Sequence, residues 1–180
     1  MAIQKQEAHW VLRAQCDDRE ALELLLRSVQ PSLRRYLCRI VGESHADDVL
    51  QEVLITVNRK LKLLHAPELF RPWAYRIATR HSFRYLKKER RWPEQVKDES
   101  VLEAVVRPET QSIELLQDLL RLDMISPASR AVLALHFEEE LPLPEVAAIL
   151  GVPLGTAKSR LAYSLAAIRK QLQYEKGLTK

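Results

Sequence analysis

The stretch GVPLGTAKSRLAYSL, residues 151–165, decides how the C-terminal part of this chain folds. Gly151 suits the left-handed position of a tight turn, and the residues after it have the composition of a helix. At about 100° per residue, the apolar side chains of this helix fall on one narrow stripe. The stripe comprises Leu154, Ala157, Leu161, Leu165, Ile168 and Leu172. The opposite side carries small and polar residues. We therefore predict a helix over residues 153–174 that buries its apolar face and leaves its polar face accessible to a partner.

The segment before the turn, LPLPEVAAIL, predicts a shorter helix over residues 143–150, with Ala147 small enough for two helices to cross closely. A helix, a short glycine turn and a second helix form a helix-turn-helix, whose second helix enters the DNA major groove. Lys158 and Arg160 suit phosphates or guanine edges, and hydroxyl groups suit bases or phosphates. The candidate DNA-contacting residues are Thr156, Lys158, Ser159, Arg160 and Tyr163. A helical hairpin with a merely solvated polar face is the alternative.

Helical periodicity extends through most of the chain, whereas alternating β-branched runs and glycines are scarce, so we predict an all-α protein. Further helices are predicted over residues 9–28, 32–40, 45–63, 72–91 and 111–123, and from Ser126, an N-cap followed by proline. Ser44 is the predicted cap of the third of these. Weak periodicity and prolines mark residues 93–110 as a linker. The predicted layout is two small helical domains, residues 1–92 and 111–180.

Charge is unevenly distributed along the chain. The net charge is +4, but residues 34–91 hold 14 Lys/Arg against 6 Asp/Glu, and residues 154–180 hold 6 against 1. The residues between these two basic blocks are acidic on balance. Solvated helix faces would explain one such block, whereas two blocks on recognisable elements indicate nucleic-acid binding.

Other classes of protein are disfavoured. Cys16 and Cys38 lack CxxC spacing, which favours buried thiols over a metal site or a disulfide. The start, MAIQKQEAHW, has no signal-peptide core, and no apolar run approaches the ~18 residues of a membrane span. We therefore expect a cytoplasmic protein without metal or cofactor. Five scattered His residues, with no Gly-rich phosphate loop, also argue against a helical enzyme.

The helix predicted over residues 72–91 carries a basic stripe. Cations recur at every fourth position, at Arg76, Arg80, Arg84 and Lys88, and aromatic residues such as Trp73 and Tyr75 lie among them. Cations mixed with aromatic rings suit single-stranded or distorted nucleic acid, because bases stack on the rings and phosphates meet the cations. The alternative is that Trp73 belongs to the core and the arginines form a solvated face.

The helix predicted over residues 45–63 begins with an acidic face inside a basic domain. Asp47, Asp48, Gln51 and Glu52 share this face. Acidic residues in a first helical turn are favoured by the helix dipole, which is the simple explanation. The functional explanation is a docking surface for a basic partner helix.

Three segments together resemble the extracytoplasmic-function sigma factors of bacterial RNA polymerase. They are ADDVLQEVLITVNRKL (46–61), FRPWAYRIATRHSFRYLKKERR (70–91) and SPASRAVLALHFEEELPLPEVAAILGVPLGTAKSRLAYSLAAIRKQL (126–172). The resemblance implies a sigma region 2 helical bundle and a sigma region 4 helix-turn-helix, joined by a flexible linker. It also implies promoter specificity rather than catalysis. The implied partners are core RNA polymerase, promoter DNA and an anti-sigma factor.

The resemblance also implies roles for the candidate residues. The acidic face, Asp47 to Glu52, resembles the family's contact surface for the coiled coil of the largest polymerase subunit. The loop 64–72 and the helix with Trp73, Tyr75, Arg76 and Arg80 resemble the part that recognises and opens the minus-10 element. The GTAKSR helix resembles the part that reads the minus-35 element as duplex.

The chain departs from the family at several of these positions. Arg80 and Arg84 stand where the family often has Asn and Asp, and Tyr163 stands where it usually has Arg. The added positive charge suggests an altered choice of promoter bases. A stand-alone helix-turn-helix regulator is the main alternative function, but it would leave the acidic face and the basic stripe without a task. A chain that serves mainly as the partner of an inhibitor is compatible with the sigma-factor interpretation.

Overall fold

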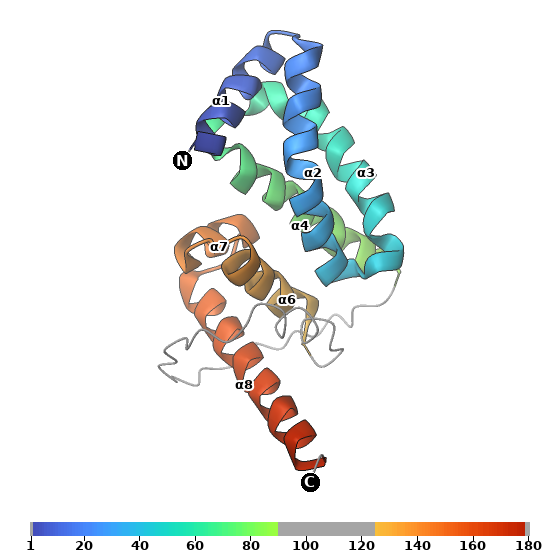
Figure 1. Cartoon of the computed structure of the whole chain (residues 1–180), viewed down its shortest axis with the longest axis vertical. Helices are drawn as coiled ribbons and strands as arrows, with labels where there is room; N and C mark the ends of the chain where they lie inside the picture. The colour runs from blue at the N-terminus through green and yellow to red at the C-terminus, as the bar shows by residue number, and fades with distance from the viewer. Residues whose placement is uncertain (1, 90–124, 179–180) are drawn as a thin grey trace. The chain divides into compact units, whose positions relative to one another are not determined.

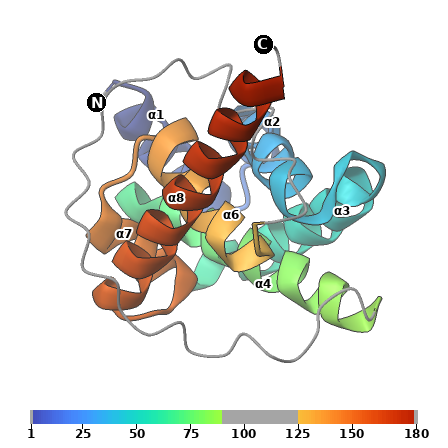
Figure 2. The same ribbon diagram turned by 90° about the horizontal axis from the view of Figure 1, so that it is seen from below.

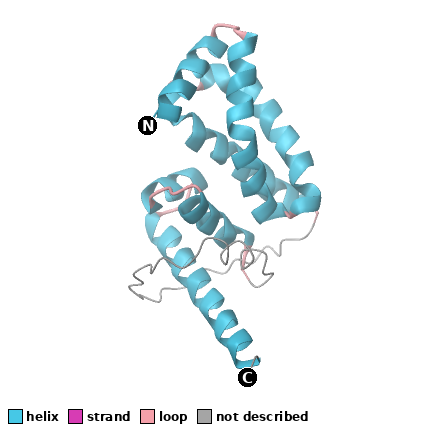
Figure 3. Cartoon of the chain, in the orientation of Figure 1, coloured by secondary structure: helices cyan, strands magenta, loops and turns pink. Residues whose placement is uncertain are grey.

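The computed structural model describes residues 2–89 and 125–178, and every regular element in these two ranges is a helix (Figure 3). The predicted all-α fold is therefore confirmed. The chain divides into two compact units, Met1–Trp92 and Pro93–Lys180. The linker predicted over residues 93–110 and the helix predicted over residues 111–123 lie outside the described residues. Within the described ranges, no helix is both long and apolar enough to cross a membrane.

Over its described residues, 2–89, the first unit contains four α-helices: α1 (Ala2–Gln15), α2 (Arg19–Val41), α3 (Glu43–Lys60) and α4 (Phe70–Lys88). Two short 3-10 helices, η1 (Leu61–Leu63) and η2 (Pro67–Leu69), connect α3 to α4. The helix α2 contacts α1, α3 and α4, and it lies beside α3 in both Figure 1 and Figure 2. The core residues it contributes are fully buried and include Ala21, Leu25, Val29, Leu33 and Leu37.

The helix predicted over residues 9–28 is instead two helices. Asp17 adopts a left-handed backbone with φ of 67°, and the Asp18 side chain caps α2 by accepting a hydrogen bond from the Ala21 N–H at 3.1 Å. This hydrogen bond and the Arg13 guanidinium beside Asp18 hold the pKa of that carboxyl below its usual range. Aspartate competes well for a helix N-cap, so a local polar signal breaks an otherwise continuous apolar pattern.

The break predicted at Pro31 is also wrong, because this proline lies inside α2. Proline removes one helical hydrogen bond, at a cost of about 3 kcal/mol. The ring of Pro31 is exposed, whereas Val29 and Leu33 on either side are fully buried. Burial of the apolar face therefore offsets the local preference, and α2 continues to Gly42, which ends it as expected.

The other two helices of this unit differ from expectation at their ends. The helix α3 begins at Glu43 after Gly42, so Ser44 is not its N-cap. It turns into η1 for its last three predicted residues. Cys16 is exposed and Cys38 is half-buried, so the expectation of two buried thiols is wrong for Cys16. Partial burial raises the pKa of the Cys38 thiol.

The second unit contains α6 (Pro127–Leu133), a π-helical turn η3 (Ala134–Glu138), α7 (Leu143–Leu150) and α8 (Leu154–Leu178). As predicted, the Ser126 hydroxyl caps α6 by accepting from the Ser129 N–H at 3.2 Å. The helix α8 contacts both α6 and α7 and runs alongside α6 in Figure 2. Its apolar stripe meets Ile125 and Leu133 in one cluster, which contains Phe137, Leu161, Leu165, Ile168 and Leu172. Leu154, at the first turn, is 38% exposed and lies outside this cluster, although the sequence predicts it as part of the stripe.

Candidate polymerase and nucleic-acid interfaces

The helix-turn-helix of the second unit has the geometry that its sequence predicts. Gly151 is left-handed, with φ of 67° and ψ of 35°, and its N–H donates to the Ala147 carbonyl. The Val152 N–H donates to the same carbonyl at 3.0 Å. These bonds close the end of α7 and turn the chain into α8 within a few residues. Ala147 is 4% exposed and Ala157 is fully buried, so small side chains lie inside the unit on both helices.

The five candidate DNA-contacting residues of α8 are not equally accessible. Lys158 and Tyr163 are exposed, whereas Thr156, Ser159 and Arg160 are partly buried. The Ser159 hydroxyl donates to the Thr156 carbonyl at 3.1 Å, so its proton is already used. Burial lowers the pKa of the Arg160 guanidinium, which stays charged at neutral pH because its ordinary value is above about 12. Of the two cations at the start of this helix, Lys158 is therefore the more exposed.

The acidic face of α3 is exposed along its whole length, at Asp47, Asp48, Gln51 and Glu52. Arg34 of α2 holds Asp47 with two hydrogen bonds of 2.7 and 3.1 Å. This pairing lowers the pKa of Asp47 and raises that of Arg34. Glu52 lies 3.1 Å from Nδ1 of His81, on α4. Two of the three carboxylates on this face thus have their orientation set by neighbouring helices.

We expect the Arg34→Gln substitution to raise the pKa of Asp47 toward that of an ordinary aspartate, because the opposite charge is removed. A depressed carboxyl pKa stabilises the fold above the unfolded-state pKa, and this contribution is lost as the pH falls through the folded-state value. Carboxyl-carbon NMR titration measures the shift. Arg27→Gln, a change on the same helix next to Glu23, should leave Asp47 unmoved. Equal Asp47 pKa values in wild type and Arg34→Gln would contradict the pairing.

The basic stripe of α4 is exposed at all four positions, Arg76, Arg80, Arg84 and Lys88. Trp73 is half-buried beside Phe70, with ring centroids 6.3 Å apart. Trp73 therefore offers part of its ring to solvent beside the stripe.

Tyr75 does not belong to this exposed set. It is 1% exposed, and its ring meets that of Tyr36 edge-on at a centroid distance of 5.3 Å. A buried ring cannot stack on a base in this conformation, so the assignment of Tyr75 to a DNA-contacting surface is wrong. Its neighbours Ala74 and Ala78 are also fully buried, so Tyr75 lies on the core side of the helix.

His81 is a residue that the sequence did not single out. Its side chain is 10% exposed and lies between α3 and α4. Besides its contact with Glu52, its Nε2 lies 3.0 Å from the Thr56 hydroxyl, and Nη2 of Arg84 lies 2.9 Å from its Nδ1. His81 thereby connects the acidic face of α3 to the basic stripe of α4. A lone histidine among cations gives no sequence signal for this role.

Comparisons with known proteins agree with this geometry. The family model Sigma-70 region 2 matches residues 25–92, and Sigma-70, region 4 matches residues 121–170, together about two thirds of the chain. The ECF RNA polymerase sigma-E factor of Escherichia coli (strain K12) is 28% identical over 176 residues, covering 91% of this chain and 92% of the relative. The RNA polymerase sigma-H factor of Pseudomonas aeruginosa is 27% identical over 190 residues, covering 96% and 97%.

Two solved structures have the same fold. The sigma factor RpoE from Bartonella quintana, in complex with the anti-sigma factor NepR, gives a TM-score of 0.65 at 25% identity, covering 84% of this chain and 96% of that one. CnrH, in complex with the cytosolic domain of CnrY, also gives 0.65, at 19% identity, covering 94% and 98%. Two helical units that match regions 2 and 4 in this order define a transcription-initiation factor of the sigma class. The chain belongs to the extracytoplasmic-function group of the sigma-70 family, as an alternative sigma factor that directs transcription initiation.

Proposed function

We propose that this sigma factor works through three surfaces, one for the polymerase and two for promoter DNA. The acidic face of α3 docks on core RNA polymerase. The connection before α4, residues 61–69, and the basic stripe of α4 with Trp73 contact the opened minus-10 element. The start of α8 reads the minus-35 duplex. The observation that carries the proposal is the placement of the first two surfaces on adjacent helices. Polymerase docking would thereby hold α4 where it can meet DNA.

The energetics of promoter opening fit this division of roles. Exposing a few bases costs a few kcal/mol, and stacking on aromatic rings contributes about 1–3 kcal/mol per base. The four exposed cations of the basic stripe add affinity for the phosphate backbone that depends on salt. Tethering both units to one polymerase raises their effective concentration at the promoter, so neither unit needs to bind DNA tightly by itself. Contacts, and not chemical catalysis, supply the free energy.

The proposal is tested by adding the purified chain to bacterial core RNA polymerase with a library of linear promoter fragments. Transcripts that begin at defined positions, absent with core polymerase alone, are the expected result. The stand-alone regulator predicts instead specific binding to duplex DNA without polymerase, and no change in start sites. That second pattern would contradict the proposed function.

The Lys158→Ala substitution is expected to weaken binding of the holoenzyme to minus-35 duplex almost equally for all sequences. It should lower the slope of log affinity against log salt by about 1, because one phosphate contact is lost. Lys158 is chosen over Arg160 because the latter is half-buried, and truncating it would also remove packing. Lys170→Ala is the control, since that exposed lysine lies about 18 Å farther along α8. Equal salt slopes for the two variants would remove Lys158 from the interface.

We further propose that the chain is regulated by an anti-sigma factor and acts in the bacterial cytoplasm, where core polymerase is found. The support is the similarity to RpoE and CnrH, whose structures were solved with NepR and with the cytosolic domain of CnrY. A protein of this kind is a specificity subunit and not an enzyme.

A further inference from the structure

The connection between α3 and α4, residues 61–69, is tied to α1 at its start. Nε2 of Gln15, the last residue of α1, donates to the Leu61 carbonyl at 2.9 Å and to the Leu64 carbonyl at 2.8 Å. The amide nitrogen of glutamine has two protons, so it satisfies both carbonyls at once. Gln15 therefore fixes the relative position of two peptide groups three residues apart.

These two carbonyls lie just after the end of α3, where no further helical N–H groups are present to donate to them. The Leu61 carbonyl also accepts from the Leu64 N–H at 3.0 Å, which closes η1, and the chain is extended at Leu64, with φ of −83° and ψ of 103°. Carbonyls at a helix C-terminus need partners from outside the helix. Gln15 supplies such a partner, and a carboxylate in its place would have no proton to donate.

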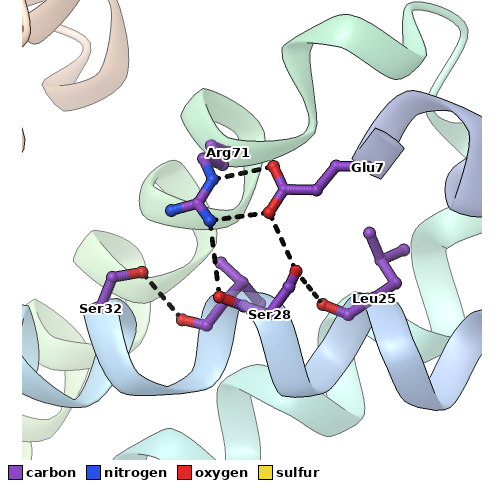
Figure 4. Close-up of polar contacts among 6 residues, drawn as sticks. Glu7, Leu25, Ser28, Ser32 and Arg71 are labelled. Carbon is purple, nitrogen blue, oxygen red and sulfur yellow. Dashed lines mark hydrogen bonds and ion pairs between the residues drawn. The ribbon is translucent and has the colours of Figure 1, made fainter. Parts of the chain in front are cut away.

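Just after the other end of this connection, the start of α4 is bound to α1 by an ion pair whose carboxylate is buried (Figure 4). Arg71, the second residue of α4, donates from Nε to Glu7 Oε2 at 2.8 Å and from Nη2 to Glu7 Oε1 at 2.7 Å. Glu7 is 2% exposed. The Ser28 hydroxyl of α2 lies 2.9 Å from Glu7 Oε1, so the carboxylate also contacts the central helix of the unit.

The two attachments are separated by eight residues of α1, or about 12 Å along the helix. The connection between them has a buried side and an exposed side. Leu64 and Phe70 are 8% and 1% exposed, whereas Leu63 and Leu69 are 68% and 51% exposed. Exposed apolar side chains on a segment whose backbone is held at both ends form a preorganised contact surface.

We infer that α1 positions the promoter-facing loop, residues 61–69, with Gln15 and Glu7 as positioning residues for recognition of the minus-10 element. The inference rests on the proposed function of this loop and of α4. Residues 2–15 precede the region 2 match, which begins at residue 25, so α1 lies outside the segment that this family model matches. A loop whose conformation is already fixed binds the promoter without a cost of ordering. Its base preference then depends on the contacts of Gln15 and Glu7, which lie away from the DNA.

The test compares holoenzymes that carry wild-type chain, Gln15→Glu, Gln15→Met or Gln6→Glu. Gln6 is an exposed residue of the same helix, so its substitution matches the charge change of Gln15→Glu. Gln15→Met removes the donor without adding charge. Each holoenzyme selects from fork-junction DNA with randomised minus-10 and minus-35 segments, and its affinity for core polymerase is measured separately.

Both Gln15 variants should bind core polymerase and select minus-35 sequences as wild type does, while their minus-10 affinity falls about tenfold and their preference there weakens. Gln6→Glu should match wild type throughout. Minus-10 selection retained by both Gln15 variants would overturn the inference. It would also be overturned if these variants lost affinity for core polymerase as much as for the minus-10 element, because Gln15 would then have a merely structural role. If wild-type holoenzyme selects no minus-10 sequence, the proposed function of the loop itself is wrong.

Discussion

Replacing Arg71 with methionine is expected to lower the free energy of unfolding of the first unit by about 3–5 kcal/mol. The Glu7 side chain is 3% exposed, and two hydrogen bonds join it to the Arg71 guanidinium. The substitution keeps an unbranched apolar stem but leaves a carboxylate buried without its counter-ion. An unpaired buried charge costs far more than the net contribution of the pair, so the effect exceeds that of an exposed arginine.

Urea unfolding followed by tryptophan fluorescence measures this effect in the intact chain. No tryptophan follows residue 92 in the sequence, whereas Trp10 and Trp73 lie in the first unit, so the signal does not come from the helix-turn-helix. Arg80→Met, the same change at an exposed position of α4, should alter stability by less than about 0.5 kcal/mol. Glu7→Met combined with Arg71→Met should recover much of the loss, because apolar replacement of both partners removes the unpaired charge. A cost for Arg71→Met no larger than for Arg80→Met would show that the pair is not coupled to folding.

The parts of the fold that the sequence predicts correctly depend on contacts a few residues apart. Ser126 and Pro127 mark the start of α6, because the Ser126 hydroxyl caps it and proline suits the first helical position. Gly151 marks the turn between α7 and α8, because a residue without Cβ adopts the left-handed backbone easily. The spacing of four residues between the cations of the basic stripe likewise places those four on the exposed side of α4. Helix caps, tight turns and exposed helix faces of this kind can therefore be predicted from residue spacing alone.

The failures occur where distant contacts decide. Pro31 is tolerated in α2 because the surrounding face is buried, which residue spacing alone does not reveal. Residue spacing does not separate Tyr75 from the DNA-facing residues, because aromatic residues occur throughout this arginine-rich helix. Only its packing against Tyr36 shows that the Tyr75 ring is buried. Both errors reflect tertiary structure that overrides local preference.

Residue spacing assigns no role to Glu7, Gln15 or His81, since each has a partner at least 21 residues away in the sequence. For Glu7, the sequence does contain a partial signal. Glu7 shares a helical face with the buried residues Val11 and Ala14, and a carboxylate on a core-facing stripe requires a buried cation or donor. The identity of Arg71 as that cation, however, follows only from the fold.

The combined Asp48→Lys and Glu52→Lys substitutions should weaken binding to core RNA polymerase about 100-fold or more. Both carboxylates are exposed on the acidic face of α3, so they are available to a basic partner helix. Reversing a charge at an interface removes an attraction and adds a repulsion, and truncation of one desolvated pair alone costs about 2–5 kcal/mol. Co-elution with core polymerase, followed by titration with labelled chain, measures the loss.

Substitutions at Asp48 and at Glu52 differ in how much they disturb the fold, so each should also be tested separately. Glu52 contacts His81, so Glu52→Lys places an ammonium group beside His81 and Arg84 and can shift α4. Asp48→Lys has no such contact to disturb in the described residues, and its loss of polymerase affinity therefore reports on docking. Glu20→Lys with Glu23→Lys makes the same total change at exposed positions of α2 and should leave affinity within about threefold. Polymerase affinity that falls equally in both double variants would indicate a general charge effect, and unchanged affinity in Asp48→Lys would move the docking surface away from the start of α3.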